Sequence, residues 1–216
     1  MWGRVQLSRG RIGGLVVSGG NANAFTGVAG EGAVRATAAA AAQALGCLRN
    51  QVFVASTGVI GEPLPLNRLT GAMPQMVEAL APGGWRSAAR AIRTTDTFIK
   101  GAWRRCEIDG YEITLGGIAK GSGMIAPNMG TMLAFLFTDA RIPSAALQAM
   151  LRASVETSFN SITVDSDTST SDTVLLVATG RSHHPPLNSP RDSKLRDFRR
   201  VLDEVMVELA TQVVRD

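Results

Sequence analysis

The sequence has few aromatic residues and no long apolar run. Aromatic residues make up 5% of its 216 residues, too few for the stacking platforms of proteins that bind single-stranded nucleic acids. No apolar stretch approaches the ~20 residues that a membrane-spanning helix needs. The first residues, Met-Trp-Gly-Arg, lack the apolar core of a secretory signal. We therefore expect no membrane partner and a cytoplasmic location, or an organellar one if a transit segment lies upstream.

Cysteine and histidine are also scarce, with two residues of each. Cys47 and Cys106 match no metal-binding or redox spacing, so we expect reduced, buried thiols. His183 and His184 lie in a proline-rich stretch, residues 180–193, which is predicted to be an exposed loop. Because no carboxylate or cysteine accompanies them, we expect no metal site there. Neither histidine has a credible serine or cysteine partner, so a hydrolase triad has no support.

The charge is mildly basic, with a net charge of +4 and a sequence pI of about 9.7. The basic residues are scattered, and the one cluster, residues 191–200, is interleaved with Asp192 and Asp197. This distribution argues against a nucleic-acid partner. A mild basic excess suits an enzyme with acidic substrates equally well.

The apolar periodicity predicts strands mixed with helices. We expect helices over residues 33–46, 63–81, 143–159 and 195–213, and strands over residues 51–56, 111–118, 131–138, 161–164 and 173–178. The strands do not alternate strictly with helices. The pattern therefore predicts an α/β fold, a layered sandwich of mixed sheets covered by helices.

A glycine-rich run at residues 116–135 leads from Lys120 to Thr131 at the start of an apolar segment. A P-loop would place the lysine after the last glycine, as Gly-Lys-Ser/Thr, whereas the order here is Lys-Gly-Ser, so we reject nucleotide phosphate binding. A lysine in such a loop is usually solvated. A hydroxyl at the mouth of a buried strand, however, is well placed to act as a nucleophile beside a pocket.

Three further motifs carry polar groups. In residues 55–61, Thr57 and Gly58 could aim a hydroxyl and an N–H at one point, as an oxyanion hole requires, or could form a plain tight turn. Residues 94–100 could cap a helix. Residues 164–173 look like a calcium loop, but the sixth position is Thr170 rather than glycine and the twelfth is Leu176 rather than glutamate. We therefore predict turn chemistry there and no metal site.

Five motifs together resemble the ornithine acetyltransferase (glutamate N-acetyltransferase) family of arginine biosynthesis. They are Ser-Gly-Gly-Asn-Ala-Asn-Ala-Phe-Thr-Gly at 18–27, Ala-Ser-Thr-Gly-Val-Ile-Gly at 55–61, Thr-Thr-Asp-Thr-Phe-Ile-Lys at 94–100, and the runs at 116–135 and 164–173. Their order along the chain agrees with the family. The departures are Phe25 for cysteine, Ile99 for proline, Gly130 for alanine, Ser166 for glycine and Ser171 for asparagine.

The resemblance implies a self-processing fold of the threonine-nucleophile type. Thr131 would attack the carbonyl of Gly130, and cleavage there would separate a first (alpha) subunit region, residues 1–130, from a second (beta) region, residues 131–216. Thr57 and Gly58 would stabilise the oxyanion. Thr94 and Lys120 would contact the substrate.

The implied activity is transfer of an acetyl group from N-acetylornithine to glutamate through an acetyl-threonine intermediate. The freed α-amino group of Thr131, with a reference pKa near ~7.7–8, would act as the base. The cycle needs no metal or coenzyme, although acetyl-CoA stays open as a donor. The two cleaved subunits would remain associated, as a heterotetramer in complete family members.

The family's chains are considerably longer, so we expect a second subunit truncated at its C-terminus and poor acetyl transfer by this chain alone. One alternative is a catalytically silent member that serves as a structural or interaction module. Another is a threonine-nucleophile amidohydrolase, which would pass the acyl group to water.

Overall fold

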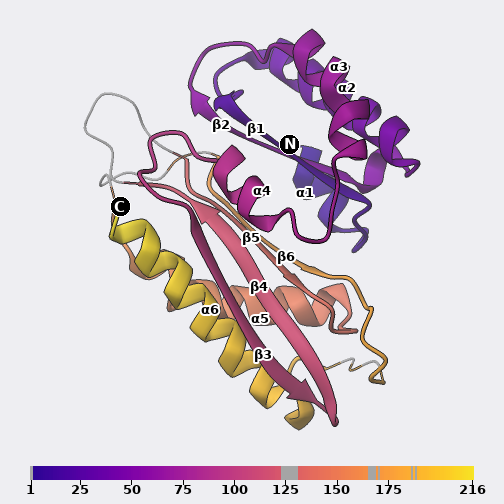
Figure 1. Cartoon of the computed structure of the whole chain (residues 1–216), viewed down its shortest axis with the longest axis vertical. Helices are drawn as coiled ribbons and strands as arrows, with labels where there is room; N and C mark the ends of the chain where they lie inside the picture. Colours follow the sequence, from indigo (N-terminus) through magenta and orange to yellow (C-terminus); the bar gives the residue numbers. More distant parts are fainter. Residues whose placement is uncertain (1, 123–130, 165–168, 170, 186, 188) are drawn as a thin grey trace. The chain divides into compact units, whose positions relative to one another are not determined.

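The computed structural model describes residues 2–122, 131–164, 169, 171–185, 187 and 189–216. The chain divides into two compact units. The first comprises Met1–Thr94, Ile125–Thr131 and Ser169–Asp172, and the second comprises Thr95–Met124, Met132–Thr168 and Thr173–Asp216. Each unit has its own sheet and its own helices (Figure 1). The predicted α/β fold with helix-covered mixed sheets is confirmed.

The first unit is built on two parallel strands, β1 (Gly14–Asn21) and β2 (Val52–Val59). A parallel pair needs a crossover connection, and the alanine-rich helix α2 (Gly27–Leu45) supplies it. Helix α3 (Leu66–Glu78) packs on α2. The remaining elements are α1 (Trp2–Leu7), a 3₁₀ turn (Arg49–Gln51) and α4 (Trp85–Ala91). The small core of this unit is formed by residues of the two strands, α2 and α3, namely Val16, Ala38, Ala41, Ala42, Val52 and Met73.

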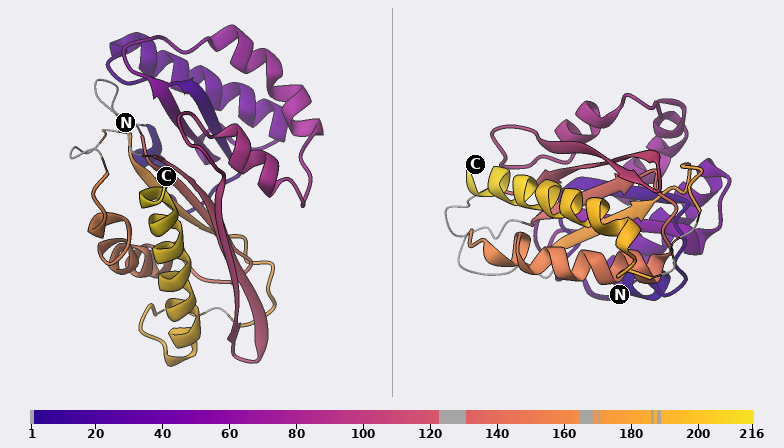
Figure 2. Two further views of the ribbon diagram at one scale, coloured as in Figure 1. Left: turned by 60° about the vertical axis from the view of Figure 1, so that its left-hand side comes forward. Right: turned by 90° about the horizontal axis from the view of Figure 1, so that it is seen from below.

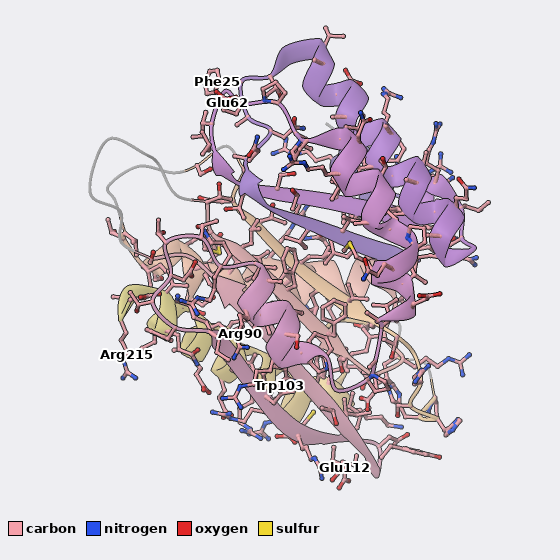
Figure 3. The ribbon with its side chains drawn as sticks, turned by 45° about the horizontal axis from the view of Figure 1, so that its top comes forward. Phe25, Glu62, Arg90, Trp103, Glu112 and Arg215 are labelled. Carbon is pink, nitrogen blue, oxygen red and sulfur yellow. The ribbon has the colours of Figure 1, made fainter. Side chains whose placement is uncertain are left out.

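The two strands of this sheet approach each other closely near their C-terminal ends. Gly58 has a φ of +126° and pairs with Gly20 in the register. A Cβ at Gly58 would lie 2.1 Å from the Gly20 carbonyl oxygen, so only glycine fits. The loops that follow the strands are joined by a hydrogen bond of 2.9 Å from the Gly61 N–H to the Ala24 carbonyl. Figure 3 shows Phe25 and Glu62 side by side on these two loops.

The second unit has a four-stranded mixed sheet in the order β3-β4-β5-β6. Its strands are β3 (Lys100–Ile108), β4 (Tyr111–Lys120), β5 (Leu133–Thr138) and β6 (Thr173–Ala178), with only β5 and β6 parallel. Helix α5 (Ser144–Glu156) lies between β5 and β6 in the chain, and α6 (Arg196–Val214) comes last. Two 3₁₀ turns are formed by Phe159–Ser161 and Ser193–Leu195. Figures 1 and 2 show α5 and α6 on the same face of this sheet.

The apolar residues of the last helix, α6, form the centre of the second core. Eight residues of α6 are buried, namely Phe198, Val201, Leu202, Val205, Met206, Leu209, Ala210 and Val213. They pack with alternate residues of β3, among them Ala102 and Ile108. On the opposite face Trp103, labelled in Figure 3, covers Gly116 of the neighbouring strand, because a Cβ there would meet its ring at 2.2 Å.

Two predictions fail in the second unit. Residues 162–164 form no strand, and a 3₁₀ turn at Phe159–Ser161 precedes them. The stretch 180–193 is not uniformly exposed, because His184 is fully buried while His183 is exposed. The imidazole Nε2 of His184 accepts a hydrogen bond from the Arg141 N–H at 2.8 Å, and its Nδ1 lies 2.7 Å from the Pro185 carbonyl. A neutral ring with its hydrogen on Nδ1 satisfies both partners.

Replacing His184 by alanine is expected to destabilise the chain by about 1–3 kcal/mol, because the partly buried Arg141 N–H would lose its acceptor. Urea unfolding followed by circular dichroism measures the change. His183→Ala is the matched control and should leave the midpoint nearly unchanged. Equal midpoints for the two variants would show that the buried hydrogen bonds of His184 contribute nothing.

Gly58→Ala is expected to destabilise the chain by at least about 1–3 kcal/mol, because alanine is strained at this φ and its methyl group meets the Gly20 carbonyl. Gly83→Ala is the control, since a Cβ at Gly83 would meet nothing within 4 Å. Thermal unfolding of both variants beside the parent decides the point. A Gly58→Ala protein that melts with the parent would contradict the close approach of β1 and β2.

Candidate active site

Thr57 and Gly58 lie inside strand β2, where Thr57 pairs with Gly19. The interpretation of this segment as a plain tight turn is therefore wrong, because extended backbone continues to Val59 and the bend follows at residues 60–61. The Thr57 side chain is fully buried. The pair thus lies at the C-terminal end of a parallel strand, and its backbone conformation is fixed by the approach to Gly20.

Thr131 is 3% exposed and lies two residues before strand β5. Its hydroxyl oxygen is 3.3 Å from the hydroxyl oxygen of Ser169. The Ser171 N–H donates to the Ser169 hydroxyl, and the Ser169 N–H donates to the Asp172 carboxylate. This polar turn therefore holds one hydroxyl beside the Thr131 hydroxyl. Gly130 and Ser166 lie outside the described residues.

Lys120 is the last residue of strand β4, and its side chain is 1% exposed. The alternative interpretation of Lys120 as a solvated loop lysine is wrong. The glycines before it serve close packing rather than a loop conformation, because Gly116 makes room for Trp103 and a Cβ at Gly117 would lie 2.5 Å from the Phe135 carbonyl. The Lys120 ammonium is 3.8 Å from the carboxylate of Asp96.

Residues 94–100 do not cap a helix, because they connect α4 to strand β3. They contain two buried charged residues that the sequence analysis missed, Asp96 and Lys100. The Lys100 ammonium lies 2.8 Å from the Asp96 carboxylate and also contacts the carboxylate of Asp216. Their spacing in the sequence is that of an exposed ion pair on a helix, so no sequence signal marked them as buried. Thr94 itself is exposed.

The candidate residues fall into both units. Thr57, Gly58, Thr94 and Thr131 belong to the first unit, and Lys120 belongs to the second. The predicted boundary between residues 130 and 131 is a cleavage position, and the division into compact units does not test it. Ser122, two residues after Lys120, is tied to Thr95 by a hydrogen bond of 2.8 Å between their hydroxyl groups.

Burial and hydrogen bonding shift the pKa of two groups in the second unit, Cys106 and Asp216. Burial raises the pKa of the Cys106 thiol to about 12, so this cysteine is not a nucleophile at neutral pH. Cys47 is only half-buried, which departs from the expectation for both thiols. Burial opposes ionisation of Asp216, but hydrogen bonds from Lys100 and Thr97 outweigh it and hold the pKa of that carboxyl below its usual range.

No cluster of three or more histidine, cysteine, aspartate or glutamate side chains has the arrangement of a metal site within the described residues. None of the helices that the structure describes is long and apolar enough to cross a membrane.

Comparison with known proteins identifies relatives along the whole chain. The model of the ArgJ family matches residues 1–216. The chain is 53% identical over 205 residues to the arginine biosynthesis bifunctional protein ArgJ of Rhizobium meliloti, covering 94% of this chain and 50% of that protein. It is 47% identical over 218 residues to the protein of the same name from Bradyrhizobium diazoefficiens, covering 100% of this chain and 53% of the relative. The chain thus spans about half the length of the curated relatives it matches.

Among solved structures, the ornithine acetyltransferase of Mycobacterium tuberculosis in complex with ornithine is similar. It is 35% identical with a TM-score of 0.49, covering 59% of this chain and 68% of that chain. The bifunctional ArgJ protein of Bacillus halodurans is 38% identical with a TM-score of 0.46, covering 53% of this chain and 60% of that chain. The match of the family model to every residue, together with relatives at about half identity, shows that the chain belongs to the ArgJ family.

Proposed function

We propose that this chain is part of an N-acetyltransferase of arginine biosynthesis that moves an acetyl group from N-acetylornithine to glutamate. The observation that carries the proposal is the family match over residues 1–216, which includes Thr131 and Lys120. Curated relatives are described as bifunctional arginine-biosynthesis proteins, and one solved relative is described as an ornithine acetyltransferase with bound ornithine.

The proposed chemistry starts with self-cleavage before Thr131. Its hydroxyl oxygen attacks the carbonyl carbon of Gly130, the peptide C–N bond breaks, and the amine that leaves is the α-amino group of Thr131. Water then hydrolyses the ester. The burial of Thr131 and the hydroxyl of Ser169 at 3.3 Å support a hydroxyl held in one orientation. The freed amine can act as the base for its own hydroxyl, because its reference pKa is near ~7.7–8.

In acetyl transfer, the Thr131 hydroxyl oxygen attacks the acetyl carbon of N-acetylornithine. The amide C–N bond breaks, and ornithine leaves with the proton that the α-amine removed from the hydroxyl. The neutral α-amine of glutamate then attacks the acetyl carbon, the ester C–O bond breaks, and the proton that the amine loses returns to the Thr131 oxygen. Thr57 and Gly58 are proposed to stabilise the oxyanion of both steps. Their rigid backbone at the end of β2 supports this role, since preorganised donors lose little energy in reorientation.

Lys120 is proposed to bind the substrate carboxylate, with Thr94 as a further contact. An ammonium buried from water interacts more strongly with a carboxylate than an exposed one does, and the 1% exposure of Lys120 supports the assignment. The proposal includes association of the two fragments, a heterotetramer for the complete protein and a cytoplasmic location. It requires no metal or coenzyme, and acetyl-CoA is a second candidate donor.

Self-cleavage is expected to yield two fragments, residues 1–130 and 131–216, in the intact mass spectrum of the purified chain. Thr131→Ala should give a single species because it lacks the attacking oxygen, whereas Thr131→Ser should still split. The matched control is Thr138→Ala, which removes another buried threonine hydroxyl in the same part of the chain. A parent protein that shows only the full-length mass after incubation would contradict the proposal that Thr131 is the nucleophile.

Incubation with N-acetylornithine is expected to add the mass of one acetyl group to the fragment that begins at Thr131. In Lys120→Met, the substrate concentration for half-maximal labelling should rise by about 10- to 100-fold. The reason is that the loss of one hydrogen bond to a charged group weakens binding by about 1.5–3 kcal/mol. Lys194→Met, which removes a partly exposed lysine, is the control. Unchanged saturation in Lys120→Met would remove Lys120 from the substrate site.

A further inference from the structure

Two lysine ammonium groups and two carboxylates are buried at one end of the second sheet. The Lys100 ammonium lies 2.8 Å from the Asp96 carboxylate and contacts that of Asp216, while the Lys120 ammonium lies 3.8 Å from Asp96. The side chains of Asp96, Lys100 and Asp216 have no exposed surface, and that of Lys120 is 1% exposed. A buried ammonium group needs a nearby negative charge to offset the cost of its desolvation. The Asp96 carboxylate supplies that negative charge to both lysines.

The two lysines project from opposite faces of the sheet. Lys100 pairs with Ala119 in the register of β3 and β4, and Lys120 is the next residue along β4. Because cross-strand partners share a face and successive residues alternate, Lys100 lies on the face of α6 and Lys120 on the other. The face of α6 is identified by Gln212, which bonds to both backbone groups of Gly101, and by Asp216. Asp96 lies where the sheet ends and reaches both ammonium groups.

Asp96 makes a different contact with each of the two lysines. Its contact with Lys100 is a hydrogen bond at 2.8 Å, whereas the 3.8 Å to Lys120 is beyond hydrogen-bond length. Asp96 therefore acts on the charge of Lys120 through a longer contact than the one it makes with Lys100. The carboxylate also accepts a hydrogen bond of 2.7 Å from the N–H of Gly121, the residue after Lys120, which has a φ of +146°. One carboxylate thus fixes the backbone beside Lys120 and acts on its charge.

We infer that Asp96 is a positioning residue, which keeps the Lys120 ammonium charged and directed at the substrate carboxylate. The inference rests on the substrate-binding role proposed for Lys120. Lys100, which two carboxylates contact, balances the charge of Asp96 from the far face of the sheet. The Lys120 charge is thereby stabilised in a buried place.

The test begins with a measurement that needs no substrate. The ¹³Cε resonance of Lys120 is followed against pH in the parent chain and in Asp96→Asn, and the Lys120→Met spectrum assigns it. The midpoint of the titration should fall in Asp96→Asn, because the charged form loses its carboxylate. Asp216→Asn is the matched control, since Asp216 contacts Lys100, and it should move the midpoint much less. An unchanged midpoint in Asp96→Asn overturns the inference.

Calorimetric titration with N-acetylornithine then tests the positioning. Asp96→Asn should weaken binding of N-acetylornithine by about tenfold or more, which is the effect expected for the loss of one contact to a charged group. In a Lys120→Met background, the same substitution should cause little further loss of affinity. Equal effects in both backgrounds, or a shifted midpoint with parent-like binding, would overturn the positioning role. If Asp96→Asn does not fold, Asp96→Glu keeps the charge and should retain the parent midpoint; a lowered midpoint there would contradict us.

The two proposals fail in different ways. A parent chain that binds no N-acetylornithine removes the proposed function, and with it any role of Asp96 toward that substrate. The Lys120 titration still decides whether the two side chains are coupled. If the parent chain binds the substrate and the Lys120 midpoint is unchanged in Asp96→Asn, only the inference about Asp96 is removed.

Discussion

The need to compensate buried charge at Asp96 constrains one whole end of the second unit. An uncompensated buried ammonium costs several kcal/mol, so Lys100 and Lys120 both require a carboxylate at fixed positions. Asp96 meets both needs only if the connection from α4 to β3 and the residues after β4 keep their conformations. The same contacts therefore set the start of one strand and the end of its neighbour.

Close backbone packing is the second constraint, and glycine supplies it in both units. Gly58 allows β2 to approach the carbonyl of Gly20, while Gly116 and Gly117 make room for the Trp103 ring and the β5 backbone. These glycines lie inside strands, although their sequence context indicated turns and loops. Glycine in a strand often marks such close approach. Thr57 and Lys120 are consequently held by rigid extended backbone, where the sequence analysis expected turn and loop conformations.

The elements predicted correctly are those with strong local patterns. The apolar stripe of α6 and the alanines of α2 have helical signals that need no tertiary information. Strand β1 was missed because Gly14, Gly19 and Gly20 weaken its strand pattern, and β3 because Arg104 and Arg105 look like loop residues. The burial of His184 and Lys100 depends on partners distant in the sequence, Arg141 and Asp216, which no local pattern specifies.

The proposed reaction sets opposite demands on two amines. The α-amino group of Thr131 must be neutral to accept a proton, while the Lys120 side chain must be charged to hold a carboxylate. A reference pKa near ~7.7–8 gives the first group a substantial neutral fraction near neutral pH. Burial works against the second, because desolvation disfavours a charged ammonium. The Asp96 carboxylate, 3.8 Å from the Lys120 ammonium, counters that effect. Because Lys100 already balances the charge of Asp96, the positive charge of Lys120 is not neutralised before the substrate meets it. In the proposed reaction, a fixed acidic partner would therefore allow a buried lysine and an unprotonated amine to act at the same pH.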